Sequence, residues 1–112
     1  AFFDDLFGLL DIPRLMEAPG HFVCWGRGHD QPGVALTVPW DKGRATVGNG
    51  VMVALAVQTP EQVRALHAKA LALGGTDEGA PGPRAEGGPG FYAGYFRDLD
   101  GNKFNVFSHV AP

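Results

Sequence analysis

The sequence predicts an α+β protein made of two βαβββ modules, the first of which lacks its opening strand. Three observations support this prediction: short apolar runs typical of strands, helix-period apolar patterns at two places, and the same order of elements in both halves. The modules are expected to form a single domain over residues 1–112, with the first module at 1–47 and the second at 48–112. A chain of 112 residues can bury a core without disulfides or structural metals.

The first module is predicted to consist of one helix and the strands that follow it. In the helix, over residues 1–10, apolar side chains have the i, i+3, i+4, i+7 spacing of one helix face: Phe3, Leu6, Phe7 and Leu10. Short apolar runs predict strands at 20–26 and 34–38. This is the order of the second module without its first strand, so that strand is expected before Ala1. The alternative is a chain that starts at Ala1 and carries no repeat.

The second module contains the clearest helix of the chain, predicted over residues 60–73. Thr59 is its expected N-cap, and Gln62 completes a capping box with it. A pair of glycines follows, as is typical of a helix C-terminus, where a left-handed residue is favoured. A continuous apolar run at 51–57 predicts the strand before this helix.

A hairpin is predicted to close the chain. Aromatic-rich strands at 91–97 and 103–109 flank the turn residues 98–102, which include Asp-Gly, and glycine tolerates the positive φ that such turns need. Before the hairpin, a weak strand is expected at 75–78. A glycine- and proline-rich loop at 79–90 is expected to form a flap beside the site.

The bulk composition excludes several classes of protein. The net charge is −3 and the Lys and Arg residues are scattered, so no nucleic-acid partner is predicted. No apolar run is long enough to span a membrane, and no membrane partner is predicted. Cys24 is the single cysteine and cannot form an internal disulfide, which favours a reducing compartment, and the predicted location is the cytoplasm.

Several segments together resemble one family. They are the helix AFFDDLFGLLDI (1–12), the Gly-Asn-Gly triplet (48–50), ALALGGTDEGAPGPR (70–84) and RDLDGNK (97–103). In combination they resemble the glyoxalase/bleomycin-resistance/dioxygenase (vicinal oxygen chelate) superfamily. The resemblance implies paired βαβββ modules whose mixed sheets form a cupped surface around a site. It also implies a divalent metal held by residues of the first and last strand of each module, and a homodimer.

The metal ligands that the resemblance implies are not present at the positions this sequence shows. Met52 stands where relatives often carry a histidine, and Asn105 stands at the position of the closing glutamate. The strand at 34–38 offers no carboxylate or imidazole. A thioether and an amide are poor ligands for a hard or borderline divalent ion. No metal and no other cofactor are therefore predicted. Zinc, nickel, iron or manganese is expected only under the alternative that the protein is a metal-dependent enzyme.

What remains at these positions is a pocket that suits a small, mostly apolar molecule. Strand alternation places Met52 with Ala54, and Asn105 with Phe107 and His109. With Tyr92 and Arg84, the pocket candidates are Met52, Ala54, Arg84, Tyr92, Asn105, Phe107 and His109. Arg84 is the one cation of the flap. The alternative is that Met52 and Phe107 fill the cavity.

Three functions are consistent with the sequence. The first is a metal-free protein of this superfamily that binds a small molecule of unassigned identity, with catalysis left open. The second is a metal-dependent glyoxalase-type lyase, isomerase or dioxygenase. The third is a non-catalytic dimeric interaction module with a filled cup. No catalytic residue is assigned, because fold alone does not choose among these functions.

Overall fold

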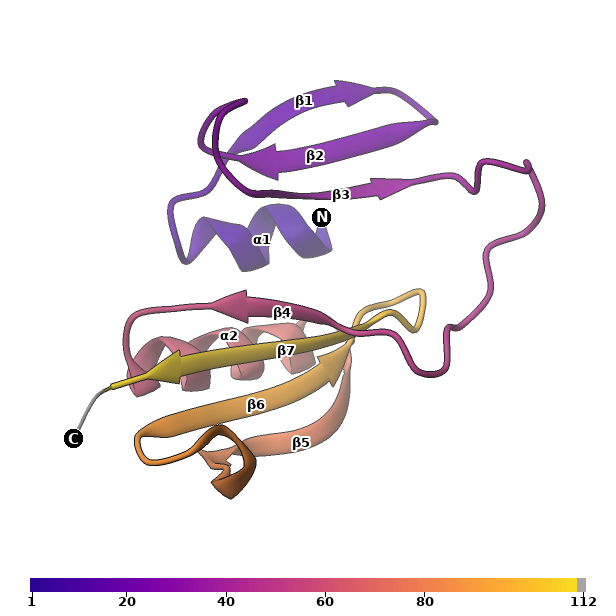
Figure 1. Ribbon diagram of the computed structural model, residues 1–112. Coiled ribbons are helices and arrows are strands. Elements are labelled where there is room, and N and C mark those ends of the chain that lie inside the picture. Colours follow the sequence, from indigo (N-terminus) through magenta and orange to yellow (C-terminus); the bar gives the residue numbers. More distant parts are fainter. Residues whose placement is uncertain (111–112) are drawn as a thin grey trace. The chain divides into compact units, whose positions relative to one another are not determined.

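The structure is a computed structural model that describes residues 1–110. The chain divides into two compact units, with the boundary between Thr46 and Val47. Phe2 is the exception and groups with the second unit. This boundary lies one residue before the predicted module boundary. Each unit combines one α-helix with a sheet, as the α+β prediction requires (Figure 1). Within the described residues, no helix has the length and apolar character needed to cross a membrane.

The first unit consists of a short helix and a three-stranded antiparallel sheet. Its elements are α1 (Phe2–Gly8), β1 (Arg14–Ala18), β2 (Phe22–Gly26) and β3 (Gly33–Thr37), in the sheet order β1-β2-β3. Aromatic side chains join the helix to the sheet. The ring of Trp25 lies 5.4 Å from that of Phe3 and 5.9 Å from that of Phe7, between centroids. The predicted helix face is therefore the one that packs on the sheet.

The sequence pattern did not predict the bounds of strand β1. Its apolar residues, Leu15 and Met16, are adjacent rather than alternating, and charged residues flank them. A bulge between Arg14 and Met16 accounts for the broken alternation, because two residues there face one partner position on β2.

The second unit contains a complete βαβββ arrangement. Its elements are β4 (Val53–Ala56), α2 (Pro60–Ala72), β5 (Thr76–Pro83), the short helix η1 (Ala85–Gly87), β6 (Phe91–Arg97) and β7 (Lys103–His109). The sheet order is β4-β7-β6-β5, with β4 parallel to β7 and the other pairs antiparallel. The mixed sheet is therefore confirmed. In the first unit, no described strand runs parallel to β3 as β4 does to β7, which agrees with a missing opening strand.

Helix α2 begins as the sequence predicts. The Thr59 hydroxyl accepts a hydrogen bond from the Gln62 backbone N–H at 3.2 Å, and Oε1 of Gln62 accepts from the Thr59 N–H at 3.3 Å. The helix ends at Ala72, one residue before the predicted end, and Gly74 follows with a φ of +102°. The buried side chains of α2 are Val63, Leu66, His67 and Ala70.

Strand β5 corrects the prediction for residues 79–90. Only 75–78 were expected to be extended, but β5 continues to Pro83, so the flap shrinks to residues 84–90. The strand carries register shifts between Asp77 and Gly79 and between Gly79 and Gly82. Glycine and proline usually interrupt strands, and here the irregular pairing of an edge strand accommodates them.

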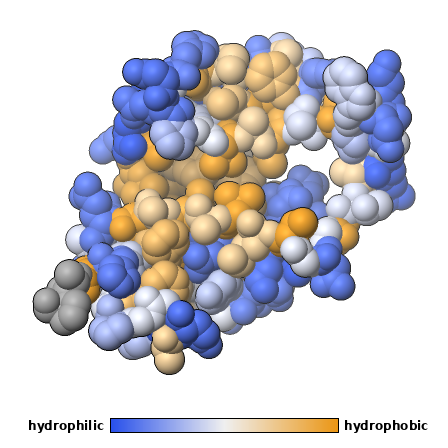
Figure 2. All heavy atoms as spheres, in the orientation of Figure 1, coloured by the Kyte–Doolittle hydropathy of each residue, from blue (hydrophilic) through white to orange (hydrophobic). Residues whose placement is uncertain are grey.

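The sheet of the second unit has two distinct faces. Phe96, Phe104 and Val106 are buried on the face that carries α2, together with the apolar stripe of the helix. On the opposite side, which we call the open face, alternation brings together Ala54, Ala56, Ala93, Tyr95, Asn105 and Phe107. Ala54 and Ala56 are exposed, and hydrophobic residues follow β4 on the molecular surface (Figure 2). The open face is the setting of the candidate site.

Candidate functional site

The turn between β6 and β7 positions the site because it sets the register of the two central strands. The side chain of Asp98 is buried, and its Oδ1 accepts hydrogen bonds from the backbone N–H groups of Asp100 at 3.0 Å and Asn102 at 2.8 Å. Its Oδ2 accepts from Nδ2 of Asn102 at 2.9 Å. Gly101 has a φ of +86°, the left-handed conformation that the Asp-Gly pair predicts. The hairpin and both strand ranges are confirmed.

The register places most of the predicted pocket residues on one face. Asn105 lies opposite Tyr95 on β6 and beside Ala54 on β4, and Phe107 lies opposite Ala93 and beside Ala56. Alternation thus groups Ala54, Asn105 and Phe107 as expected. The result is a surface of small and aromatic side chains with one buried amide.

Asn105 has a specific hydrogen bond that defines the orientation of its amide. The residue is 4% exposed, and its Nδ2 donates to the backbone oxygen of Gly94 at 3.2 Å. A carbonyl oxygen accepts hydrogen bonds and cannot donate them, so the amide nitrogen must face Gly94. An ionised carboxylate at this position would turn an acceptor toward the same oxygen. Asn105 is therefore a structural hydrogen-bond donor, and it also replaces the carboxylate that the family resemblance implies with an amide.

Met52 lies outside the strand that was expected to hold it. Strand β4 begins at Val53, not at residue 51, and both Val51 and Met52 are exposed. Met52 shares the strand face of Ala54 only by extrapolation of the alternation beyond the paired residues. The predicted strand was too long because the continuous apolar run 51–57 contains no local stop signal.

The residues at these positions do not fit the metal that the superfamily resemblance implies. One position carries an exposed thioether, and the other carries a buried amide whose nitrogen already faces a backbone oxygen. Neither group supplies negative charge to balance a divalent cation. Within residues 1–110, no three His, Cys, Asp or Glu side chains gather as a metal site would need.

Tyr92, expected among the pocket residues, lies on the face that carries α2. The Nη1 atom of Arg64 donates to the Tyr92 hydroxyl at 3.1 Å, and the guanidinium carbon of Arg64 lies 5.6 Å from the ring centroid. Two adjacent positions of a strand point to opposite faces, and Tyr92 and Tyr95 differ by three positions. The tyrosine of the open face is therefore Tyr95, and the choice of Tyr92 is wrong.

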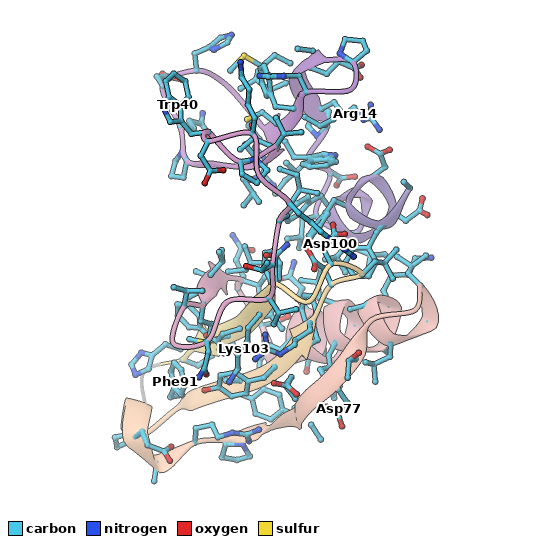
Figure 3. The ribbon with its side chains drawn as sticks, turned by 90° about the vertical axis from the view of Figure 1, so that its right-hand side faces the viewer. Arg14, Trp40, Asp77, Phe91, Asp100 and Lys103 are labelled. Atoms are coloured by element: carbon cyan, nitrogen blue, oxygen red, sulfur yellow. The ribbon has the colours of Figure 1, made fainter. Side chains whose placement is uncertain are left out.

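The remaining candidates lie at the margins of the open face. His109 is the exposed last residue of β7, opposite Phe91. The ring of Phe91 stacks on that of Phe107 with centroids 5.4 Å apart. Lys103 and Phe91 come from the first positions of β7 and β6 (Figure 3). Arg84 follows β5, and its guanidinium carbon lies 5.5 Å from the centroid of Tyr95.

Sequence reasoning missed His67, a buried polar residue behind the site. It is 6% exposed, and its Nε2 lies 3.0 Å from Oδ1 of Asp77 and 3.1 Å from the backbone oxygen of Tyr95. The pKa of Asp77 is lowered, first by the Gly79 backbone N–H and then by His67. The signal was present in the helix pattern: His67 follows Val63 by four positions and so belongs to its buried stripe.

No family model matches the chain, and no curated protein does. A glyoxalase/bleomycin resistance protein from Albidiferax ferrireducens T118 superposes with a TM-score of 0.81 at 36% identity, covering 97% of this chain and 85% of that one. A hypothetical protein, SA1046 from S. aureus, is 28% identical, with a TM-score of 0.68 and coverage of 92% and 80%.

A third similar structure is a glyoxalase/bleomycin resistance protein/dioxygenase family enzyme from Burkholderia phytofirmans PsJN. It has a TM-score of 0.73 at 19% identity, covering 97% of this chain and 86% of that one. At this identity the likeness concerns the fold alone. The three structures superpose on most of this chain, with TM-scores of 0.81, 0.68 and 0.73.

Proposed function

Because the chain belongs to the glyoxalase/bleomycin resistance/dioxygenase superfamily, we propose that its open face binds a small, mostly apolar molecule without the metal of that superfamily. The observation that carries the proposal is the orientation of Asn105. Its amide nitrogen donates to Gly94 at 3.2 Å, at the position where metal-dependent members would present a carboxylate. The position is used to hold two strands together.

The side chains around Asn105 support binding of an apolar molecule. Ala54 and Ala56 are small and exposed, so they leave room above the sheet. Phe107 is half-buried and stacked on Phe91, which gives a rigid aromatic surface beside them. Small-molecule sites are lined mostly by apolar and aromatic side chains with few polar groups to orient a ligand, and the open face has this composition.

Metal analysis of the purified full chain tests the metal-free part of the proposal. We expect less than stoichiometric zinc, nickel, iron and manganese after purification without chelators. One equivalent of any of these metals would contradict the proposal and favour the alternative, a metal-dependent lyase, isomerase or dioxygenase. Thermal unfolding in the presence of a panel of aromatic compounds tests the binding part, because a ligand of the native state raises its stability.

An Ala54→Trp variant locates any binding that is found. The residue is exposed, so the larger side chain is tolerated by the fold, but it covers the area next to Asn105. We expect the thermal shift caused by the ligands to disappear in this variant. An unchanged shift would place the binding site elsewhere. If no compound stabilises the wild-type protein, the interaction-module alternative is favoured.

We also propose that the protein is a homodimer in a reducing compartment such as the cytoplasm. Six of the large apolar residues that are most exposed within residues 1–110 lie between positions 38 and 53: Val38, Trp40, Val47, Val51, Met52 and Val53. Trp40 is 99% exposed, which is costly for its large apolar surface in water. Light scattering after size exclusion tests the dimer, and a monomer at micromolar concentration would contradict it. The free thiol of Cys24 fits a reducing compartment.

A further inference from the structure

Two positively charged side chains lie beside one aromatic ring at the edge of the open face. The guanidinium carbon of Arg84 is 5.5 Å from the ring centroid of Tyr95, and the Nζ atom of Lys103 is 5.6 Å from the same centroid. Tyr95 is also the strand neighbour of Asn105. We call Arg84, Tyr95 and Lys103 the cationic cluster. It adjoins the apolar part of the open face.

The guanidinium of Arg84 is held in place by the backbone of β5. Its Nη2 donates to the oxygen of Ala80 at 2.6 Å, and its Nη1 donates to that of Pro83 at 3.3 Å. The strand leaves room for it because two neighbouring residues are glycines. A Cβ at Gly79 would lie 3.4 Å from Nη2 and 3.0 Å from the Tyr95 ring, and one at Gly82 would lie 3.2 Å from Nη1. The Arg84 guanidinium is therefore held in one position by these contacts.

The charges of the cluster are not neutralised by ion pairs in the part of the chain that the structure describes. Within residues 1–110, neither Arg84 nor Lys103 forms an ion pair. Arg97, in contrast, is paired with Glu78 at 3.0 Å. A guanidinium has five N–H donors and an ammonium has three, so both side chains retain donors for a ligand.

We propose that the cationic cluster binds the anionic group of a small organic acid whose apolar part rests on Ala54, Ala56 and Phe107. This inference rests on the proposed function and specifies its ligand class. The anionic group can be a carboxylate, a sulfonate or a phosphate, because each accepts hydrogen bonds from Arg and Lys. Cation–π contacts of partly solvated side chains are weak, so they position the cations without competing strongly with an anion.

A pair of fluorescent probes tests the inference on the full chain. Anilinonaphthalene sulfonate and phenylnaphthylamine share one aryl skeleton and differ by the sulfonate group. We expect the sulfonate probe to bind about tenfold or more tightly, a difference of about 1.4 kcal/mol. We also expect its affinity to fall as salt rises, because salt screens charges at the surface.

Substitutions in the cationic cluster test whether Arg84 and Lys103 cause the preference for the sulfonate probe. In Arg84→Gln and Lys103→Gln, each affinity for the sulfonate probe should fall several-fold, while the affinity for the neutral probe stays the same. Lys69→Gln, on helix α2, removes one positive charge outside the cluster and should change neither affinity. Circular dichroism and thermal unfolding establish that each variant is folded. Lys103→Gln is the decisive variant if Arg84→Gln perturbs β5.

The outcomes separate this inference from the proposed function. Equal affinity for both probes, lost in Ala54→Trp, would overturn the inference and leave the proposed function standing. A preference for the sulfonate probe that survives both cluster substitutions would also overturn the inference. Binding of neither probe would contradict both proposals. A series of benzoate, benzenesulfonate and phenyl phosphate as competitors then identifies the preferred anion.

Discussion

The Nε2 nitrogen of His67 in α2 lies 3.0 Å from the Oδ1 oxygen of Asp77 in β5. The backbone oxygen of Tyr95 lies 3.1 Å from the same nitrogen. Both neighbours are acceptors, so Nε2 carries the proton and donates. Asp77 Oδ1 also accepts from the Gly79 backbone N–H at 2.9 Å, where the register of β5 shifts. One buried imidazole thus connects the helix, the irregular edge strand and the strand that carries Tyr95.

Replacing His67 with leucine is expected to lower the free energy of unfolding by about 1–3 kcal/mol. The substitution fills a similar buried volume but removes the Nε2 donor from the Tyr95 oxygen and the Asp77 carboxylate, which keeps only its bond from the Gly79 N–H. Urea unfolding monitored by fluorescence measures the loss. His109→Leu is the matched control, because His109 is exposed, and it should change stability by less than about 0.5 kcal/mol. Equal losses in the two variants would contradict the role of His67.

The Asp77 carboxylate is expected to make stability depend on pH in the acid range. Its pKa in the folded protein is lowered from the usual 3.8, chiefly by the Gly79 N–H and next by His67. A lowered pKa means that this contribution is complete above the unfolded-state pKa and is lost as pH falls through the folded-state pKa. The urea midpoint is measured at intervals of about one pH unit, from about pH 6 to about pH 2. It should fall less steeply with falling pH in Asp77→Asn than in the wild type. Parallel curves would show that Asp77 has no such effect.

Asn105→Glu is expected to lower the free energy of unfolding by about 1–3 kcal/mol near neutral pH, because it buries an acceptor facing the Gly94 oxygen. Burial raises the pKa of such a carboxyl group, and its protonated form can donate to Gly94. The loss of unfolding free energy relative to wild type should therefore shrink as the pH is lowered to about 5, which approaches the pKa of free glutamate. Asn105→Gln, which keeps an amide, is the control, and its loss should not depend on pH. An Asn105→Glu variant as stable as wild type at neutral pH would contradict this account of the amide.

Asp98→Ala is expected to lower the free energy of unfolding by about 2 kcal/mol, because two backbone N–H groups and the Asn102 amide lose their shared acceptor. Asp100→Ala is the control in the same turn, since the exposed Asp100 carboxylate accepts no hydrogen bond within residues 1–110. Thermal unfolding of both variants measures the difference. If the two variants lose the same stability, the buried carboxylate is not what holds the turn.

Elements with strong local signals agree closely between sequence and structure. The capping box of Thr59 and Gln62 and the Asp-Gly turn at Gly101 involve residues only a few positions apart, so their hydrogen bonds depend on the local chain. The strands of the hairpin match their predicted ranges for the same reason. The candidates of the open face were grouped correctly where alternation alone decides, as for Asn105 and Phe107.

Elements whose conformation depends on distant partners were predicted less well. Strand β5 contains Gly79, Pro81 and Gly82, which locally favour a loop, and it is extended because β6 provides a partner for it. Val51 and Met52 continue an apolar run, yet β4 begins only at Val53, where pairing with β7 starts. Tyr92 and Tyr95 look equivalent in sequence, and only the position of α2 on one face distinguishes them.

The sequence by itself determined the superfamily, the α+β class, the helix α2 and the closing hairpin. It also shows Met52 and Asn105 at the positions where the family resemblance implies metal ligands. These features reside in residue identities and in hydrogen bonds between near neighbours. Only the tertiary structure decided that the Asn105 nitrogen faces Gly94, that His67 is buried, and that Arg84 and Lys103 share one ring. Each of these relationships joins separate strands or a strand and a helix, and the register that creates it is a property of the whole sheet.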